Sequence, residues 1–194
     1  MSFRVEEKLL INKYQISEFK NFLSENKANK PYPSRVIKSL YFENFKNEMY
    51  KDSVEGSTPR KKIRVRNYPN SQNNSVYLET KISSVEGRYK TSKKIDKNTY
   101  EQIVNTGIYD YQYGVCSPLI YVTYKREYYK INDVRISIDE DIKYSLFTGR
   151  EVGYDNNSIV ELKSSFYKNR DNLINNFPFQ RTRFSKYCNG FEKI

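Results

Sequence analysis

Hydrophobic and polar residues alternate along much of this chain with a period of two, which is typical of β-strands that bury one face. In the stretch RKKIRVRNY (60–68), cations alternate with aliphatic side chains from Lys62 to Arg66. Because successive side chains of a strand point to opposite faces, we expect Lys62, Arg64 and Arg66 on one face. We predict eight strands, over residues 3–11, 36–44, 61–68, 75–83, 87–95, 118–129, 134–142 and 158–166.

Three other segments have the pattern of helices. QISEFKNFLSEN (15–26) places its apolar residues on one helical face, and KNTYEQIVNTG (97–107) does the same and ends at a glycine. NRDNLINNF (169–177) ends before a proline. We predict loops at KDSVEGSTP (51–59) and at NYPNSQNNSVY (67–77), the second of which closes a hairpin.

The balance of elements indicates the fold class. Eight strands with few helices predict an antiparallel β or α+β fold, and this number of strands also fits a closed barrel. The 194 residues are expected to form one domain, long enough to bury a hydrophobic core. The 19 tyrosines support a strand-rich fold, because aromatic side chains favour strands.

The polar side of most predicted strands carries charges, and two arrangements satisfy this pattern. In one, the apolar face lines the core and the charged face meets water, as in most antiparallel sheets. In the other, the sheet closes with its charged face inside and its apolar face under the helices. That interior costs free energy unless the charges pair and a polyanion with a metal fills it.

Three features of the sequence favour the charged interior. Arginine is frequent at strand centres, and its guanidinium recognises phosphate in a bidentate manner. The amphipathic helices need an apolar surface to cover. Acidic residues occur singly among the bases, as a metal site in a positive field requires; they are Glu6, Glu79, Asp139 and Glu161.

Composition narrows the chemistry. The chain has 34 Lys and Arg residues against 23 Asp and Glu, and its net charge of +11 indicates an anionic partner. It has no histidine, which excludes Cys/His zinc sites, Ser-His-Asp triads and Cys-His dyads. It also has neither a P-loop nor a GxGxxG loop. Any metal must therefore be held by carboxylates and ligand oxygens, the donors that magnesium (Mg²⁺) and manganese (Mn²⁺) prefer.

The sequence gives no sign of membrane insertion or export. Charged residues interrupt every apolar run well before the roughly 18 residues of a membrane-spanning helix. The N-terminal stretch MSFRVEEKLLI has no signal-peptide core, so we expect a cytoplasmic protein.

The ordered motifs of the chain resemble a known family. RVEEK, SLYFEN, KKIRVRNY, YLETK, YKREYY followed by DVRISIDEDI, IVELK and RFSKYCNG occur in the order typical of the VTC (vacuolar transporter chaperone) domain, from Arg4 to Gly190. That domain is similar to the CYTH enzymes of the triphosphate tunnel metalloenzyme group. The resemblance implies an α+β fold: an eight-stranded antiparallel closed β-barrel (a tunnel) with a basic lumen and a few helices packed outside.

The resemblance also implies roles for individual residues. Those matched to catalysis are Lys8, Arg64, Arg66, Lys81, Arg126, Arg135 and Lys186. Those matched to substrate binding are Lys90, Arg88, Ser185 and Arg4. Glu161 matches the metal-ligand glutamate, and Glu6 and Glu79 are weaker metal candidates. The implied cofactor is Mn²⁺ or Mg²⁺.

The function that follows is a metal-dependent phosphotransferase acting on ATP or polyphosphate, with polyphosphate polymerase as the leading activity. Its alternatives are an inorganic triphosphatase and a non-catalytic polyphosphate- or nucleotide-binding module. The expected partners are ATP, triphosphate or polyphosphate, together with an unseen membrane or regulatory partner. A nucleic-acid binder fits less well, because the bases alternate within strands and no RRM or KH signature occurs.

Some of these residues also have a purely structural interpretation. Lys62, next to other cations, is expected at the rim of the site rather than among its ligands. Asp139 could serve as a strand-end partner of Arg135. Ser185 could be the N-cap of a helix.

Overall fold

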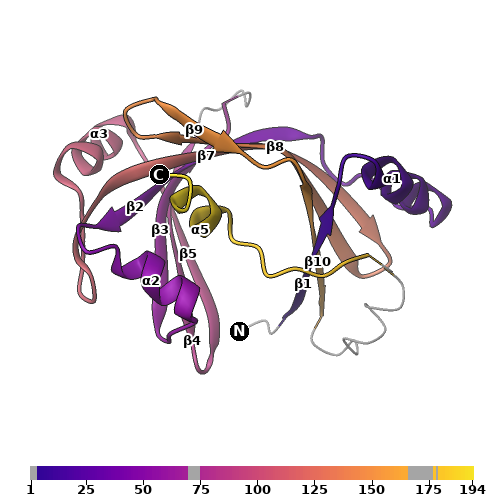
Figure 1. The fold of residues 1–194 in the computed structure, drawn as a ribbon, viewed down its shortest axis with the longest axis horizontal. Helices are drawn as coiled ribbons and strands as arrows, with labels where there is room; N and C mark the ends of the chain where they lie inside the picture. The colour runs from indigo at the N-terminus through magenta and orange to yellow at the C-terminus, as the bar shows by residue number, and fades with distance from the viewer. Residues whose placement is uncertain (1–3, 70–74, 166–176, 178) are drawn as a thin grey trace. The chain divides into compact units, whose positions relative to one another are not determined.

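The structure is a computed structural model that describes residues 4–69, 75–165, 177 and 179–194 (Figure 1). Its elements, in chain order, are β1 (Arg4–Ile11), α1 (Gln15–Glu25), β2 (Arg35–Asn44), α2 (Glu48–Glu55), β3 (Arg60–Asn67), β4 (Val76–Ser84), β5 (Gly87–Ile95), α3 (Lys97–Thr106), β6 (Ile108–Asp110), β7 (Gly114–Ile131), β8 (Val134–Leu146), β9 (Glu151–Tyr154), β10 (Ser158–Ser165) and α5 (Lys186–Phe191). The predicted α+β class is confirmed.

The strands belong to one sheet of ten strands, in the order β1-β10-β8-β7-β2-β3-β4-β5, with β6 paired to β7 and β9 to β8. The prediction of a closed barrel is wrong for the described residues, because this path has two ends, β1 and β5. The outer edge of β1 is already occupied: Leu10 N donates to Gln180 O (3.0 Å) and Thr182 N donates to Lys8 O (3.0 Å). The 180–182 segment thus occupies the edge that barrel closure would require.

The chain divides into two compact units. Unit 1 comprises Met1–Arg35, Tyr124–Ile142 and Tyr154–Phe184, and unit 2 comprises Val36–Thr123, Lys143–Gly153 and Ser185–Ile194. The prediction of a single domain over residues 1–194 stays a prediction.

Unit 1 buries the apolar face of β1, β10 and β8 under α1. Phe19 and Leu23 of α1 are fully buried, and they pack with strand residues that alternate as predicted. These strand residues are Leu9, Ile11, Ile136, Ile138, Val160 and Leu162. The opposite face of the same strands carries Glu6, Lys8, Asp139 and Glu161, because the side-chain period is two.

Unit 2 repeats this plan with β2, β3 and β4. Its apolar core contains Leu40, Phe42, Ile63 and Val65, against which Tyr100, Ile103 and Val104 of α3 pack. On β3 the charged face is buried as well: Arg64 and Arg66 are each 7% exposed, against 2% for Ile63 and 4% for Val65. The arrangement in which the charged face simply meets water is therefore wrong for Arg64 and Arg66.

The eight predicted strands are the eight of the paired path, but three short elements, β6, β9 and α2, were not predicted. The strands β6 and β9 have only three and four residues. The prediction of a loop at 51–59 is wrong in its first half, which lies in α2. The start of α2 depends on a residue outside the helix, because Glu43 of β2 accepts hydrogen bonds from Met49 N (3.2 Å) and Tyr50 N (2.9 Å).

Two further predictions concern segments that can be placed only in part. The predicted helix at 169–177 lies, except for Phe177, outside the described residues. In the part of the chain that the structure describes, no helix is both long enough and apolar enough to cross a membrane.

Candidate functional site

The polar face of unit 2 gathers cations from three neighbouring strands. Lys62 of β3 lies in register with Lys81 of β4, which lies in register with Lys90 of β5. Like charges directly opposite one another destabilise a sheet. A row of three lysines across three strands is therefore unfavourable by itself and becomes favourable when an anion lies over it.

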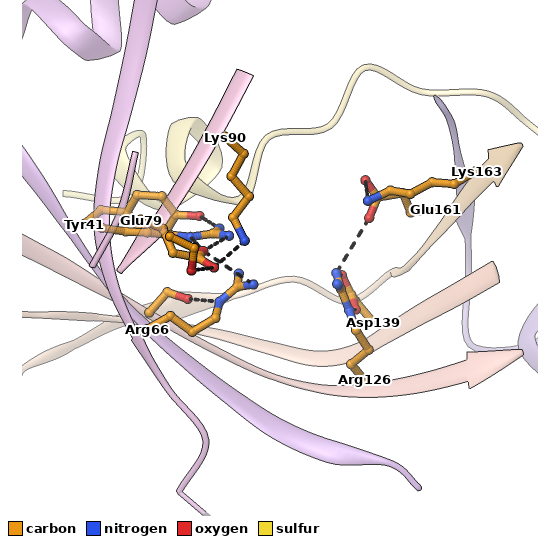
Figure 2. Close-up of polar contacts among 11 residues, drawn as sticks. Tyr41, Arg66, Glu79, Lys90, Arg126, Asp139, Glu161 and Lys163 are labelled. Carbon is orange, nitrogen blue, oxygen red and sulfur yellow. Dashed lines mark hydrogen bonds and ion pairs between the residues drawn. The ribbon is translucent and has the colours of Figure 1, made fainter. Parts of the chain in front are cut away.

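The next row of this face contains a buried carboxylate, that of Glu79 on β4, which binds cations of both neighbouring strands. Figure 2 shows Arg66 and Lys90 directed at the Glu79 carboxylate. Arg64 donates to Glu79 Oε2 from Nε (2.8 Å) and from Nη2 (2.6 Å). Arg66 Nη1 lies 3.8 Å from the same oxygen, and Lys90 Nζ donates to Oε1. We call the set Ser39, Tyr41, Arg64, Arg66, Glu79 and Lys90, together with Lys62 and Lys81, the cation cluster.

The pKa of Glu79 reflects this environment. Burial would raise it, but the charges of Arg64 and Arg66 and the hydrogen bonds from Lys90 and Arg64 outweigh that effect and lower it to about 2. Glu79 is therefore ionised at neutral pH, and it orients the two guanidinium groups. As a metal ligand Glu79 stays a prediction; in the structure it forms ion pairs with Arg64, Arg66 and Lys90.

Two further side chains, both on β2, fix the arginines from the other side. Arg64 Nη1 donates to the hydroxyl of Tyr41 (2.8 Å), and Arg66 Nε donates to Ser39 Oγ (3.2 Å). Sequence reasoning did not single out these two residues. The signal was present, because Ser39 and Tyr41 alternate along SLYFEN, directly opposite Arg66 and Arg64.

The start of α5 adjoins the lysine row. Lys62 Nζ donates to Ser185 Oγ (2.8 Å) and lies 5.4 Å from the ring centroid of Tyr187. Ser185 also caps α5, accepting from Cys188 N (3.3 Å), which confirms its interpretation as a helix N-cap. Its role in substrate binding stays a prediction. Lys62 was expected at the rim, whereas the structure gives it a half-buried position beside Ser185 and Cys188.

The polar face of unit 1 holds a second group of charges, which we call the carboxylate cluster: Glu6, Lys8, Arg126, Asp139, Glu161 and Lys163. Arg126 binds Asp139 through two hydrogen bonds, from Nε to Oδ1 (2.5 Å) and from Nη2 to Oδ2 (2.7 Å). Its Nη2 also lies 3.8 Å from Glu161 Oε2. A dashed line marks this ion pair in Figure 2. The interpretation of Asp139 as the partner of Arg135 is therefore wrong: Asp139 pairs with Arg126.

Glu6 and Glu161 form a hydrogen-bonded pair of carboxyl groups. Burial and this hydrogen bond raise the pKa of Glu6. Burial acts in the same direction on Glu161, but the hydrogen bond from Glu6 and the charges of Lys163, Arg126 and Lys8 hold its pKa well below the usual range. When the pair holds one proton, that proton is therefore on Glu6, and Glu161 is the ionised partner.

This pair fits a divalent cation in part. A hard cation prefers carboxylate oxygens and would take the place of the shared proton. Among the described residues, no group of three Asp, Glu, Cys or His side chains is arranged to hold a metal. Glu6 and Glu161 would therefore hold Mn²⁺ or Mg²⁺ only together with oxygens of the substrate or of water.

The comparison with protein families can now be set beside this geometry. A family model described as VTC domain matches residues 3–194. The chain belongs to the VTC domain family. Among curated protein sequences, none matches it.

Solved structures agree with this VTC membership at the level of the fold. A putative adenylyl cyclase from Hippeastrum, described as having a dominant triphosphatase activity, is 13% identical and has a TM-score of 0.63, with 98% of this chain and 96% of that chain covered. A putative adenylate cyclase from Bacillus halodurans is 13% identical with a TM-score of 0.63, over 95% and 94% of the two chains. A conserved hypothetical protein from Pyrococcus furiosus is 16% identical with a TM-score of 0.61, over 96% and 99%. At these identities the likeness concerns the fold alone.

Four predicted site residues of this VTC domain belong to neither cluster as defined above. Arg135 is exposed and lies opposite Lys163, and Arg88 is exposed near the start of β5. Lys186 is half-buried in the first turn of α5. The backbone of Arg4 pairs with Ser165, while its side chain lies outside the described part. Their roles stay predictions.

Proposed function

We propose that the chain is a metal-dependent phosphotransferase that acts on ATP or polyphosphate and that its activity is polyphosphate polymerisation. The observation that carries the proposal is the cation cluster, in which Lys62, Lys81 and Lys90 stand in register beside two buried arginines. Glu79 is one carboxylate among the five cations of this cluster, so the cluster keeps a positive surplus, and a chain of phosphates supplies negative charges at regular spacing.

In this proposal the cation cluster binds the phosphates. Arg64 and Arg66 are already oriented by Glu79, Tyr41 and Ser39, so little reorganisation accompanies binding. Planar guanidinium groups suit bidentate contacts with phosphate oxygens, and the lysines add charge without fixed geometry. Phosphoryl transfer needs mainly positioning and charge neutralisation, so the absence of histidine is no obstacle.

The carboxylate cluster has the complementary task. Glu161, with Glu6, would hold Mn²⁺ or Mg²⁺, and such a cation neutralises charge on phosphate oxygens when it is bound. Arg126 is held by Asp139 in a fixed orientation, and Lys8 donates to Phe184 O (2.6 Å). We assign Arg126 and Lys8 to phosphate binding in this unit.

The nucleophile decides between two reactions. In the polymerase, an ionised terminal phosphate oxygen attacks the γ-phosphorus of ATP, and ADP leaves. In the triphosphatase, water attacks instead and phosphate is released. The second candidate is favoured by the structural similarity to the Hippeastrum protein, for which a dominant triphosphatase activity is described.

The test is to incubate the protein with ATP and Mn²⁺ and to follow both polyphosphate on gels and free phosphate. Long chains support the polymerase, and phosphate without chains supports the triphosphatase. If neither product forms while ATP is bound, the chain is a binding module and the enzymatic proposal fails.

Matched variants locate the activity. Arg64→Gln should lower the rate about 10²–10³-fold, by analogy with the loss of one donor from a preorganised anion site. Arg150→Gln removes the same charge from an exposed position and should leave the rate unchanged. Glu161→Gln should abolish metal-dependent turnover with the fold intact. Full activity in both Arg64→Gln and Glu161→Gln would contradict the assigned site.

A further inference from the structure

Tyr41 is a buried tyrosine whose hydroxyl belongs to the cation cluster rather than to the apolar core. The residue is 6% exposed, and its hydroxyl accepts a hydrogen bond from Arg64 Nη1 (2.8 Å). Its ring lies 5.2 Å from the ring of Tyr187. The neighbouring strand places Arg64 directly opposite it, so the contact is set by the register of β2 and β3.

The groups that face Tyr41 are mostly cations. Arg64 and Arg66 come from β3 and Lys81 from β4. Tyr187 of α5 is neutral, because burial and the charge of Glu43, to which its hydroxyl donates, raise its pKa. Burial would raise the pKa of Tyr41, but these three cations and the hydrogen bond from Arg64 lower it to about 7. Near neutral pH a large fraction of Tyr41 is therefore a phenolate.

We infer that Tyr41 is an internal counter-ion of the cation cluster and that it takes up a proton from solvent when a triphosphate binds there. The inference rests on the proposed function, which places the phosphates on this cluster. A bound triphosphate brings negative charge to Arg64, Arg66 and Lys81, and so removes the attraction that favours the phenolate. The phenolate oxygen then gains a proton and remains a partner of Arg64.

A pH dependence follows by linkage. Because the complex holds one proton more than the free protein above about pH 7, triphosphate binding weakens as the pH rises. If the proton stays bound in the complex, the affinity falls about fivefold from pH 7 to pH 8 through Tyr41 alone. If Tyr41 only oriented Arg64, replacing it with phenylalanine would lower the affinity for triphosphate by the same factor at pH 7 and at pH 8.

The experiment is calorimetric titration of the whole chain with inorganic tripolyphosphate at pH 8, in buffers of different ionisation enthalpy. Wild type should take up close to one proton more than Tyr41→Phe, and its affinity should fall about fivefold more than that of the variant between pH 7 and pH 8. The difference between proteins cancels the protonation of tripolyphosphate itself. Tyr187→Phe is the matched control, because it changes a neighbouring buried tyrosine bonded to Glu43 and should behave as wild type.

A second measurement needs no variant. Tripolyphosphate should reduce the near-ultraviolet tyrosinate absorbance of the wild-type protein at pH 8. Equal proton uptake by wild type and Tyr41→Phe, or an unchanged tyrosinate signal, overturns the role of Tyr41 and leaves the proposed function standing. Absence of tripolyphosphate binding by the wild-type protein overturns both.

Discussion

Replacing Glu79 with glutamine separates the two roles that a buried carboxylate could have in this fold. Glu79 is 3% exposed, and Arg64, Arg66 and Lys90 converge on it. Glutamine keeps the size of the side chain and removes its charge. We expect the variant to be less stable, because the buried Arg64 and Arg66 and the exposed Lys90 lose their shared partner. We also expect it to bind triphosphate more tightly, because the cluster gains one positive charge.

The size of the stability change follows from the pKa. A fall from 4.5 in the unfolded chain to about 2 in the folded protein corresponds to about 3 kcal/mol. Since the folded-state pKa is the lower one, this stabilisation is complete above pH 4.5 and is lost as the pH falls toward about 2. The gap in unfolding free energy between wild type and Glu79→Gln should therefore be about 3 kcal/mol at pH 7 and shrink through that window.

Urea unfolding at several pH values measures this gap, and calorimetric titration with tripolyphosphate measures the affinity. Glu86→Gln is the control, because Glu86 is an exposed residue at the β4–β5 turn. If Glu79→Gln kept wild-type stability and triphosphate affinity but lost its response to Mn²⁺, the counter-ion role would be refuted and the metal-ligand prediction would replace it.

Three further predictions concern other contacts. Asp139→Asn should lower the free energy of unfolding, measured with urea at pH 7, by about 3–5 kcal/mol, because it leaves the guanidinium of Arg126 without its bidentate partner. A loss below about 1 kcal/mol, the size expected for an exposed ion pair, would contradict this prediction. Gly190→Ala should lower the free energy of unfolding by about 1–3 kcal/mol, because the added Cβ would lie 2.6 Å from Cδ1 of the buried Tyr144 ring. An unchanged melting temperature would contradict this prediction and show that the ring moves aside. The affinity for Mn²⁺ should fall as the pH is lowered, because the raised pKa of Glu6 makes the metal compete with the Glu6 proton. Glu6→Gln should remove that part of the pH dependence, and an identical pH profile in the variant would exclude Glu6 as a ligand.

The strands could be predicted because their pattern is local. Alternation identifies both faces of β3 and β4 without knowledge of their partners, and the predicted helix at 97–107 ends at Gly107, as α3 does. The helix α2 could not be found in this way, because its first N–H groups are bound by Glu43, a residue of the preceding strand. Closure of the sheet is also beyond a local pattern, since it depends on which segment occupies the outer edge of β1.

The sequence was sufficient to predict which charged residues lie on the strand faces of the candidate site, but not which of them pair with one another. The sequence marks Arg64, Arg66 and Glu79 as charged residues on strand faces, and the register of β3 with β4 then places Arg64 opposite Glu79. No pattern within either strand specifies that register. Asp139 is an example: Arg135 lies on the same strand, yet Asp139 forms its bidentate contact with Arg126 of the neighbouring strand β7.

The cation cluster holds its arginines in place before any phosphate arrives, and this has an energetic consequence for unit 2. Burying Arg64 and Arg66 is unfavourable, and Glu79 and Tyr41 offset that penalty while leaving a positive surplus. Burial of the apolar face of β3, with Ile63 and Val65, offsets the unfavourable free energy of this excess positive charge. An anion that binds the cluster removes the penalty and stabilises the folded state by mass action, by about 2.7 kcal/mol at a hundredfold excess over its Kd. Stability and anion affinity in this unit are thus coupled through the same side chains, so substitutions that relieve the surplus should raise the melting temperature and weaken phosphate binding together.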